Sequence, residues 1–153
     1  TKDPQNEDLM AINTYWEAYE IAGVSLLDMY MWRWLYEHPD ATPAQLKEAV
    51  MTMAKDIWNK YYAPVFKVQD CTILAIYSHM VAYPLYLSDY PIGHVISYQI
   101  ERFMQGKSLG VEMERICKQG YMTPKQWMQA AVGSDISADA LVSAAKEALS
   151  RIK

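Results

Sequence analysis

Apolar residues recur at intervals of three and four through residues 7–37, and this spacing constrains the fold more than any other feature of the sequence. Residues at these intervals share one face of an α-helix. The pattern predicts one long helix or two in tandem, with a small residue, Gly23, where another backbone can approach closely. It ends at His38, because a residue before proline resists the helical conformation. The residues of the pattern are Leu9, Ile12, Trp16, Tyr19, Gly23, Leu26, Tyr30 and Trp34.

Two threonine–proline pairs mark the starts of further helices. Thr42 and Thr123 each precede a proline and are followed three residues later by glutamine, the pattern of an N-terminal capping box. These signals predict a helix from residue 43 to about Tyr62 and another over residues 124–132.

Prolines interrupt the middle of the chain. Pro64 is expected to end the second helix. Residues 71–82 are apolar without a period, which predicts a helix buried nearly all round. Residues 83–90 contain Pro84 and are followed by Pro91, so we expect a kinked or irregular segment there.

The last third of the chain also reads as helical. We expect helices over residues 92–104 and 111–118, the second closed by Gly120. Ser137 is expected to cap the last helix. Its buried stripe would be formed by Leu141, Ala145, Ala148 and Ile152.

The fold class follows from these patterns. No useful length of the sequence alternates apolar and polar residues as a half-buried strand does. We therefore predict an all-α protein, an irregular bundle of about six to seven helices. Residues 1–153 show no repeat or linker, so they are interpreted as one domain or one inseparable part of a larger one.

Composition excludes several classes of protein. The net charge is −4, and acids and bases are interspersed, so a nucleic-acid partner is not expected. The apolar runs are too short for a membrane span. Cys71 and Cys117 lie in apolar helical patterns and are expected to be buried thiols. No signal peptide is recognised, and a chain that begins at Thr1 is expected to be part of a longer protein.

Two histidines and three tyrosines form the strongest candidate site. His79 and His94 flank the segment that carries Tyr83, Tyr86 and Tyr90. Phenol and imidazole groups donate hydrogen bonds to a peptide carbonyl or a developing oxyanion, and a proline-kinked backbone can turn several of them toward one groove. The alternative is a set of core and interface aromatics with satisfied hydrogen bonds.

Other polar residues carry less chemistry. The chain has three histidines and no HExxH motif, so no metal site is expected within it. His38 is expected to be a solvated residue at a helix end. Glu17, Glu20 and Asp28 are interpreted as the solvated face of the first helix.

The segment from His79 through Tyr83, Tyr86 and Tyr90 to the run Tyr-Pro-Ile-Gly resembles the His and multi-Tyr segment near the C-terminus of M3-type zinc metallopeptidases, the thimet oligopeptidase and oligoendopeptidase F family. Two later turns also resemble that family's C-terminal tail. They are residues 106–110 (Gly-Lys-Ser-Leu-Gly) and 131–137 (Ala-Val-Gly-Ser-Asp-Ile-Ser).

This resemblance implies the C-terminal part of a larger all-helical peptidase. In that family the His and Tyr residues bind the substrate backbone and stabilise the tetrahedral intermediate while zinc-activated water attacks the peptide. His79 would bind substrate. His94 has no counterpart in that family; it is a further candidate for binding substrate, with a structural role beside Tyr90 as the alternative. Tyr83, Tyr86 or Tyr90 would be catalytic. The zinc ligands would lie before Thr1, so zinc is expected in the parent enzyme and this chain alone would be inactive.

The resemblance also implies partners: a peptide substrate and the remaining N-terminal part of the same protein. A different class of function stays open. The 12 Tyr, 5 Trp and 10 Met could form the surface of a non-enzymatic helical module that binds a partner helix or dimerises. Cutting an enzyme in two could also expose apolar surface that pairs artificially.

Overall fold

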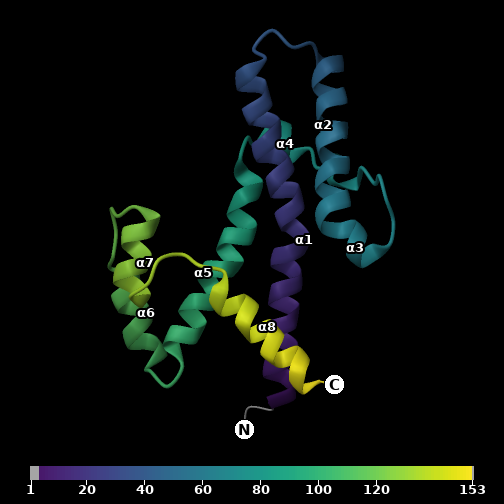
Figure 1. Cartoon of the computed structure of the whole chain (residues 1–153). Coiled ribbons are helices and arrows are strands. Elements are labelled where there is room, and N and C mark those ends of the chain that lie inside the picture. The colour runs from purple at the N-terminus through teal and green to yellow at the C-terminus, as the bar shows by residue number, and fades with distance from the viewer. Residues whose placement is uncertain (1–3, 153) are drawn as a thin grey trace. The chain divides into compact units, whose positions relative to one another are not determined.

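The computed structural model describes residues 4–152, and all regular structure among them is helical (Figure 1). The predicted all-α, multi-helix class is therefore confirmed. The chain divides into two compact units, one made of Thr1–Glu17 with Ile92–Lys153 and one made of Ala18–Pro91. The interpretation as a single domain stays a prediction.

The longest element is α1, which spans Pro4–Glu37 without a break. It confirms the helix expected from the apolar spacing, and its part from Ala18 onward belongs to the Ala18–Pro91 unit. A turn through Pro39 leads to α2 (Pro43–Ile57), which returns alongside α1 (Figure 1). The predicted capping box is present, since Thr42 accepts a hydrogen bond from the Gln45 amide and Gln45 accepts one from the Thr42 amide.

The core of the Ala18–Pro91 unit lies between α1, α2 and the segments that follow α2. Gly23 does allow a close approach, but the approaching group is the Tyr62 side chain rather than a backbone. The Tyr62 hydroxyl accepts a hydrogen bond from the Gly23 amide at 2.8 Å. The buried members of this core are Val24, Leu27, Met31, Ala54, Ile57, Trp58, Tyr62, Ala63, Leu74, Met80 and Leu87.

Pro64 does not end the second helix, so that prediction was wrong. A π-helical turn at Trp58–Tyr62 follows α2, and the chain continues into α3 (Ala63–Phe66) with Pro64 in its first turn. Proline lacks an amide hydrogen and is tolerated where the regular α-helical bonding pattern has just been interrupted. The chain turns away at Lys67, whose backbone is left-handed.

The apolar stretch over residues 71–82 is not the buried helix that its composition suggested. It forms a 3₁₀ turn (Ile73–Ile76) and the four-residue helix α4 (His79–Ala82). Leu74 and Met80 are buried, whereas Ile76 and Val81 are more than two-thirds exposed. Because its apolar residues follow no helical period, this segment has no single apolar face to bury. It crosses the surface of the core and inserts few side chains into it. A further 3₁₀ turn, Tyr86–Ser88, completes the irregular segment that the prolines predicted.

The other unit is built mainly from four helices: α5 (Asp89–Met104), α6 (Leu109–Cys117), α7 (Pro124–Val132) and α8 (Asp139–Arg151). The Thr123 capping box at the start of α7 is confirmed. Leu141, Ala145 and Ala148 of α8 are buried as predicted, but Ile152 is half exposed. Arg151 near the end of α8 forms a bidentate ion pair with Asp8.

Several local predictions in this part of the chain were wrong. Gly120 does not cap α6, which ends at Cys117. The residue with a left-handed backbone in this region is Tyr121. Ser137 does not occupy the N-cap position, which is Ala138, although its hydroxyl accepts a hydrogen bond from the Asp139 amide. Cys117 is exposed and Cys71 only partly buried, so neither is a core thiol.

Within residues 4–152, no helix has both the length and the apolar character needed to cross a membrane.

Candidate functional site

Four of the predicted site residues come together on one irregular segment of the Ala18–Pro91 unit. We call His79, Tyr83, Tyr86 and Tyr90 the aromatic cluster. His79 begins α4, Tyr83 caps its C-terminus, Tyr86 begins a 3₁₀ turn and Tyr90 lies in the first turn of α5. The backbone changes direction at Leu85, which has a left-handed conformation with φ of 64°.

The rings of the aromatic cluster form a continuous series. The His79 ring lies 5.9 Å from that of Tyr83 and 6.3 Å from that of Tyr86, measured between centroids. The Tyr83 and Tyr86 rings are 6.2 Å apart, and those of Tyr86 and Tyr90 are 5.4 Å apart in an edge-on arrangement. These distances are typical of interacting aromatic side chains.

The three phenols are accessible from outside. Tyr83, Tyr86 and Tyr90 are 62%, 44% and 43% exposed, which is not the burial of core residues. The Tyr90 hydroxyl donates a long hydrogen bond of 3.4 Å to the Tyr86 hydroxyl oxygen. That bond raises the pKa of Tyr90, with smaller contributions from desolvation and from the neighbouring Tyr86 charge. Tyr90 therefore stays a neutral phenol at neutral pH.

Asp28 was misplaced by the sequence analysis. Instead of lying on a solvated face it is fully buried. Its carboxylate accepts hydrogen bonds from the backbone amides of Leu85 and Leu87, on either side of Tyr86. The helical spacing could have revealed this, since Asp28 lies four residues after Val24 and three before Met31, both core residues.

His94 does not belong to the unit that carries the aromatic cluster. It belongs to the unit formed by Thr1–Glu17 and Ile92–Lys153. There its Nδ1 lies 3.8 Å from Oε2 of Glu17, and both side chains are partly exposed. The role of His94 in binding peptide stays a prediction.

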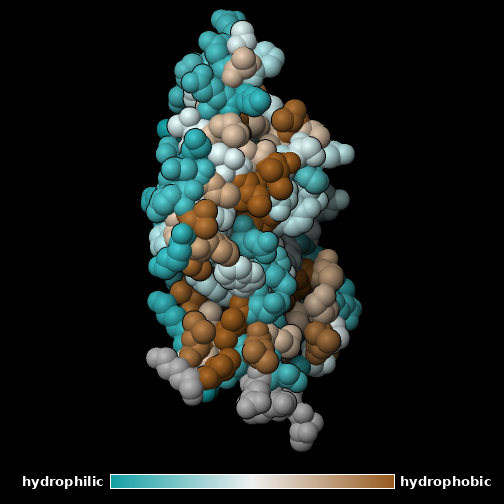
Figure 2. Space-filling model, turned by 90° about the vertical axis from the view of Figure 1, so that its right-hand side faces the viewer, coloured by the Kyte–Doolittle hydropathy of each residue, from teal (hydrophilic) through white to brown (hydrophobic). Residues whose placement is uncertain are grey.

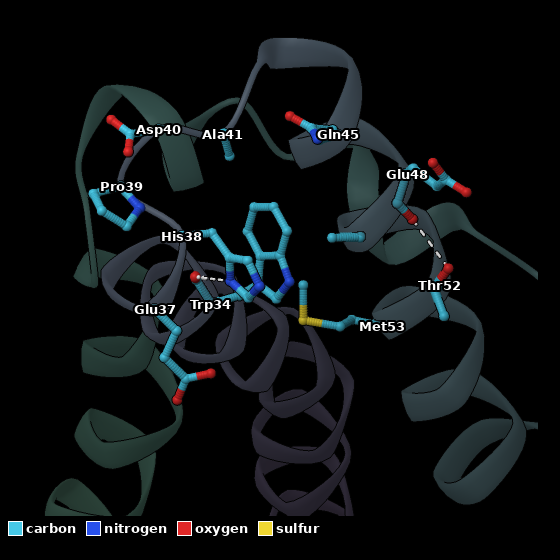
Figure 3. Close-up of a pocket in the computed structure, with 11 residues that line it drawn as sticks. Trp34, Glu37, His38, Pro39, Asp40, Ala41, Gln45, Glu48, Thr52 and Met53 are labelled. Atoms are coloured by element: carbon cyan, nitrogen blue, oxygen red, sulfur yellow. Dashed lines mark hydrogen bonds between the residues drawn. The ribbon is translucent and has the colours of Figure 1, made fainter.

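A hollow lies at the turn between α1 and α2, and Figure 3 shows the residues that line it. It has a volume of about 710 Å³. The Trp34 indole stacks on the His38 ring with centroids 4.2 Å apart, and the Trp34 carbonyl lies 2.8 Å from Nδ1 of His38. His38 is exposed at the end of α1, as predicted. None of the five aromatic or histidine residues predicted as site residues lines this hollow.

The described residues do not supply a metal site. Among residues 4–152, no three His, Cys, Asp or Glu side chains gather closely enough to hold a metal ion. The peptidase resemblance implies zinc ligands outside these residues, before Thr1.

The contact between Tyr86 and Tyr90 gives a testable pKa. Replacing Tyr86 by phenylalanine removes the oxygen that accepts the Tyr90 hydrogen bond, so we expect the pKa of Tyr90 to fall toward its ordinary value of 10.0. NMR titration of tyrosine labelled at Cζ measures this. Tyr36→Phe is the matched control, since Tyr36 is a well-exposed tyrosine of α1. Identical Tyr90 titration in both variants would contradict the contact.

Comparison with known proteins gives no relative: no protein-family model, no curated protein and no solved structure matches this chain. The geometry of the aromatic cluster and the resemblance of the tyrosine segment are the observations that bear on its function.

Proposed function

We propose that this chain forms the C-terminal, peptide-binding and transition-state-stabilising part of an M3-type zinc endopeptidase. The observation that carries the proposal is the exposed aromatic cluster, in which one imidazole and three phenols gather on an irregular segment of residues 79–90. Peptide is the substrate of the whole enzyme, and the rest of that enzyme is the partner of this chain.

The cluster has the chemistry needed to bind a peptide backbone. Neutral phenols and an imidazole N–H donate hydrogen bonds to carbonyl oxygens. In an extended peptide, carbonyls on one side recur about every 7 Å. Neighbouring rings of the cluster are spaced by 5.4 to 6.3 Å. Tyr83 and Tyr86, whose ring centroids are 6.2 Å apart, can therefore lie against successive carbonyls on one side of an extended peptide. The Tyr86 and Tyr90 hydroxyl oxygens are 3.4 Å apart and can approach the same carbonyl. A donor of this kind also stabilises the negative charge that develops on a carbonyl oxygen under attack.

The metal belongs to another part of the proposed enzyme. Residues 4–152 hold no suitable group of ligands. We therefore assign to this chain only the hydrogen bonds of the aromatic cluster to substrate. The reading frame upstream of Thr1 is expected to encode an HExxH motif followed by a helix with a glutamate ligand.

A peptide titration tests the proposal directly. We expect acetyl-tetra-alanine-amide, which offers carbonyls and no side-chain function, to shift the NMR signals of His79, Tyr83, Tyr86 and Tyr90. The dissociation constant should be roughly millimolar. A net hydrogen bond contributes only about 1 kcal/mol, and about four such bonds give the roughly 4 kcal/mol of a millimolar complex. The triple variant Tyr83→Phe, Tyr86→Phe, Tyr90→Phe should lose these shifts.

Tyr36→Phe is the control for the titration, because it removes one exposed phenol outside the cluster. It should bind the peptide as the unchanged chain does. Binding that survives in the triple variant, or no shift in the unchanged chain, contradicts the proposal. With zinc added, the chain alone is expected not to cleave peptides. Cleavage that is lost on replacing His79 or His94 by alanine would show that the metal site lies within this chain.

A helical interaction module is the second candidate, and the exposed apolar segment between α3 and α5 favours it. Ile73, Ile76 and Val81 lie on this segment and are 50%, 71% and 73% exposed. Figure 2 shows hydrophobic residues reaching the surface in several places between hydrophilic ones. Exposed apolar surface of this kind is typical of a binding face. Light scattering separates the candidates, since a chain that stays monomeric at high concentration does not pair with itself.

A further inference from the structure

The aromatic cluster is carried by a backbone that does not hold its shape unaided. Leu85, between Tyr83 and Tyr86, has φ of 64° and ψ of 6°. This left-handed conformation is unfavourable for a residue with a side chain. Something outside the segment must therefore stabilise the turn that sets Tyr86 between its neighbours.

One face of α1 supplies that stabilisation. Ser25, Asp28 and Trp32 are spaced by three and four residues, so they lie on the same side of the helix. The Ser25 hydroxyl lies 2.6 Å from the Leu87 carbonyl oxygen, and Nε1 of Trp32 donates to the Met80 carbonyl oxygen at 2.9 Å. These contacts fix the backbone near both ends of the cluster.

Asp28 holds the turn itself. Its Oδ1 accepts from the Leu85 amide at 3.3 Å and its Oδ2 accepts from the Leu87 amide at 3.4 Å. A fully buried carboxylate is costly unless it is paired or hydrogen-bonded. Within the described part of the chain, Asp28 has no Lys, Arg or His partner. With one amide on each of its two oxygens, the carboxylate binds both sides of the turn at once.

We infer that Asp28 is the positioning residue of the aromatic cluster: by binding the amides on either side of Tyr86, it fixes the left-handed turn at Leu85 and places the Tyr86 ring between His79 and Tyr90. The effect of Asp28 on peptide binding rests on the proposed function. Its effect on the turn does not, and the two can be measured separately.

Amide hydrogen exchange in the Asp28→Asn variant tests the inference. Asparagine keeps one acceptor oxygen and turns a donor toward the second amide. We expect the Leu85 and Leu87 amides to exchange at least about tenfold faster, the ratio that corresponds to one hydrogen bond to a charged group. The Ile57 amide in α2 should keep its rate. Asp89→Asn, the same change at an exposed acid of the same segment, should leave all three rates unchanged.

A second readout distinguishes positioning from general destabilisation. Loss of the turn separates Tyr86 from Tyr90, so the raised pKa of Tyr90 should fall toward its ordinary value in Asp28→Asn. Adding Leu85→Gly should restore much of that shift, because glycine adopts the left-handed conformation without strain. Unchanged exchange, equal acceleration at Leu85, Leu87 and Ile57, or failure of Leu85→Gly to restore the Tyr90 pKa would overturn the inference.

If the Asp28→Asn variant does not fold, amide hydrogen exchange in the unchanged chain tests the inference instead. Its Leu85 and Leu87 amides must then exchange more slowly than the intrinsic rates of an unstructured chain, and free exchange at either amide overturns the inference. Titration with acetyl-tetra-alanine-amide separates the two proposals. If the unchanged chain does not bind the peptide but its exchange results hold, the proposed function fails while Asp28 remains the residue that fixes the turn.

Discussion

Replacing Gly23 by alanine is expected to destabilise the chain by about 2 kcal/mol, although alanine favours helices. A Cβ atom at this position would lie 2.4 Å from both Cε2 and the hydroxyl oxygen of Tyr62. Overpacking of this kind costs about 1–3 kcal/mol. Each hydrogen bond lost by a displaced Tyr62 costs about 1 kcal/mol. Alanine returns about 1 kcal/mol through its better helix propensity.

Tyr62 cannot easily move aside. Its ring is buried and stacks on Trp58 with centroids 5.3 Å apart. Its hydroxyl oxygen lies 2.7 Å from the Tyr19 carbonyl oxygen, to which it donates, and it accepts from the Gly23 amide. Burial raises the pKa of this phenol to about 12. The hydroxyl therefore stays a neutral donor well above neutral pH.

Gly93→Ala in α5 is the matched control. Nothing lies within 4 Å of a Cβ atom built on Gly93. This second helical glycine should therefore gain about 0.5–1 kcal/mol when replaced by alanine. Urea unfolding followed by far-UV circular dichroism measures both variants. A Gly23→Ala chain as stable as the unchanged one would show that Tyr62 is free to shift.

The second large effect is expected at Trp58, where alanine should cost about 3–5 kcal/mol. Trp58 is buried in the π-helical turn, and its ring stacks between Tyr62 and Phe66, with centroids 5.3 and 5.6 Å away. Its Nε1 donates to the Val68 carbonyl oxygen at 2.8 Å. The side chain thus contributes to the core and also fixes the link that follows α3.

A milder variant separates these two contributions. Trp58→Phe keeps an aromatic ring in the core but removes the Nε1 donor, so we expect a loss of about 1–3 kcal/mol from the unpaired carbonyl and the smaller ring. Trp34→Ala is the control, since Trp34 is only partly buried and lines an open hollow. Its urea midpoint should fall less than that of Trp58→Ala. Equal loss at the two tryptophans would contradict the central place of Trp58 in the core.

Sequence reasoning succeeded where the signal is local. The period of α1 and the Thr42 and Thr123 capping boxes depend on residues within a few positions of each other, and the structure confirms them. It failed where contacts with residues far away in the sequence determine the local structure. Pro64 continues a helix because a π-helical turn precedes it, and Asp28 is buried because its carboxylate meets amides 57 and 59 residues away.

The candidate site shows the same division. Pro84 correctly indicated an irregular segment, but Pro91 does not interrupt the chain, because α5 begins at Asp89 and includes Pro91 in its first turn. The structure brings four of the five predicted residues together along residues 79–90. The catalytic and binding roles of those residues stay predictions. The left-handed turn at Leu85 had no local signal, because leucine rarely adopts it and the acid that holds it lies on α1. For the same reason the apolar run over residues 71–82 could not reveal that most of its side chains stay outside the core.

The division of the chain into a continuous and a discontinuous unit also orders its synthesis. Ala18–Pro91 is a single uninterrupted stretch, so every residue of its core and of the aromatic cluster has been synthesised before Ile92 is added. The other unit needs both ends of the chain, and its Asp8–Arg151 pair joins residues 143 positions apart. Because domains form as their sequences emerge, the tyrosine-bearing unit can mature first. The beginning of α1 must wait for α8, the last helix of the described residues.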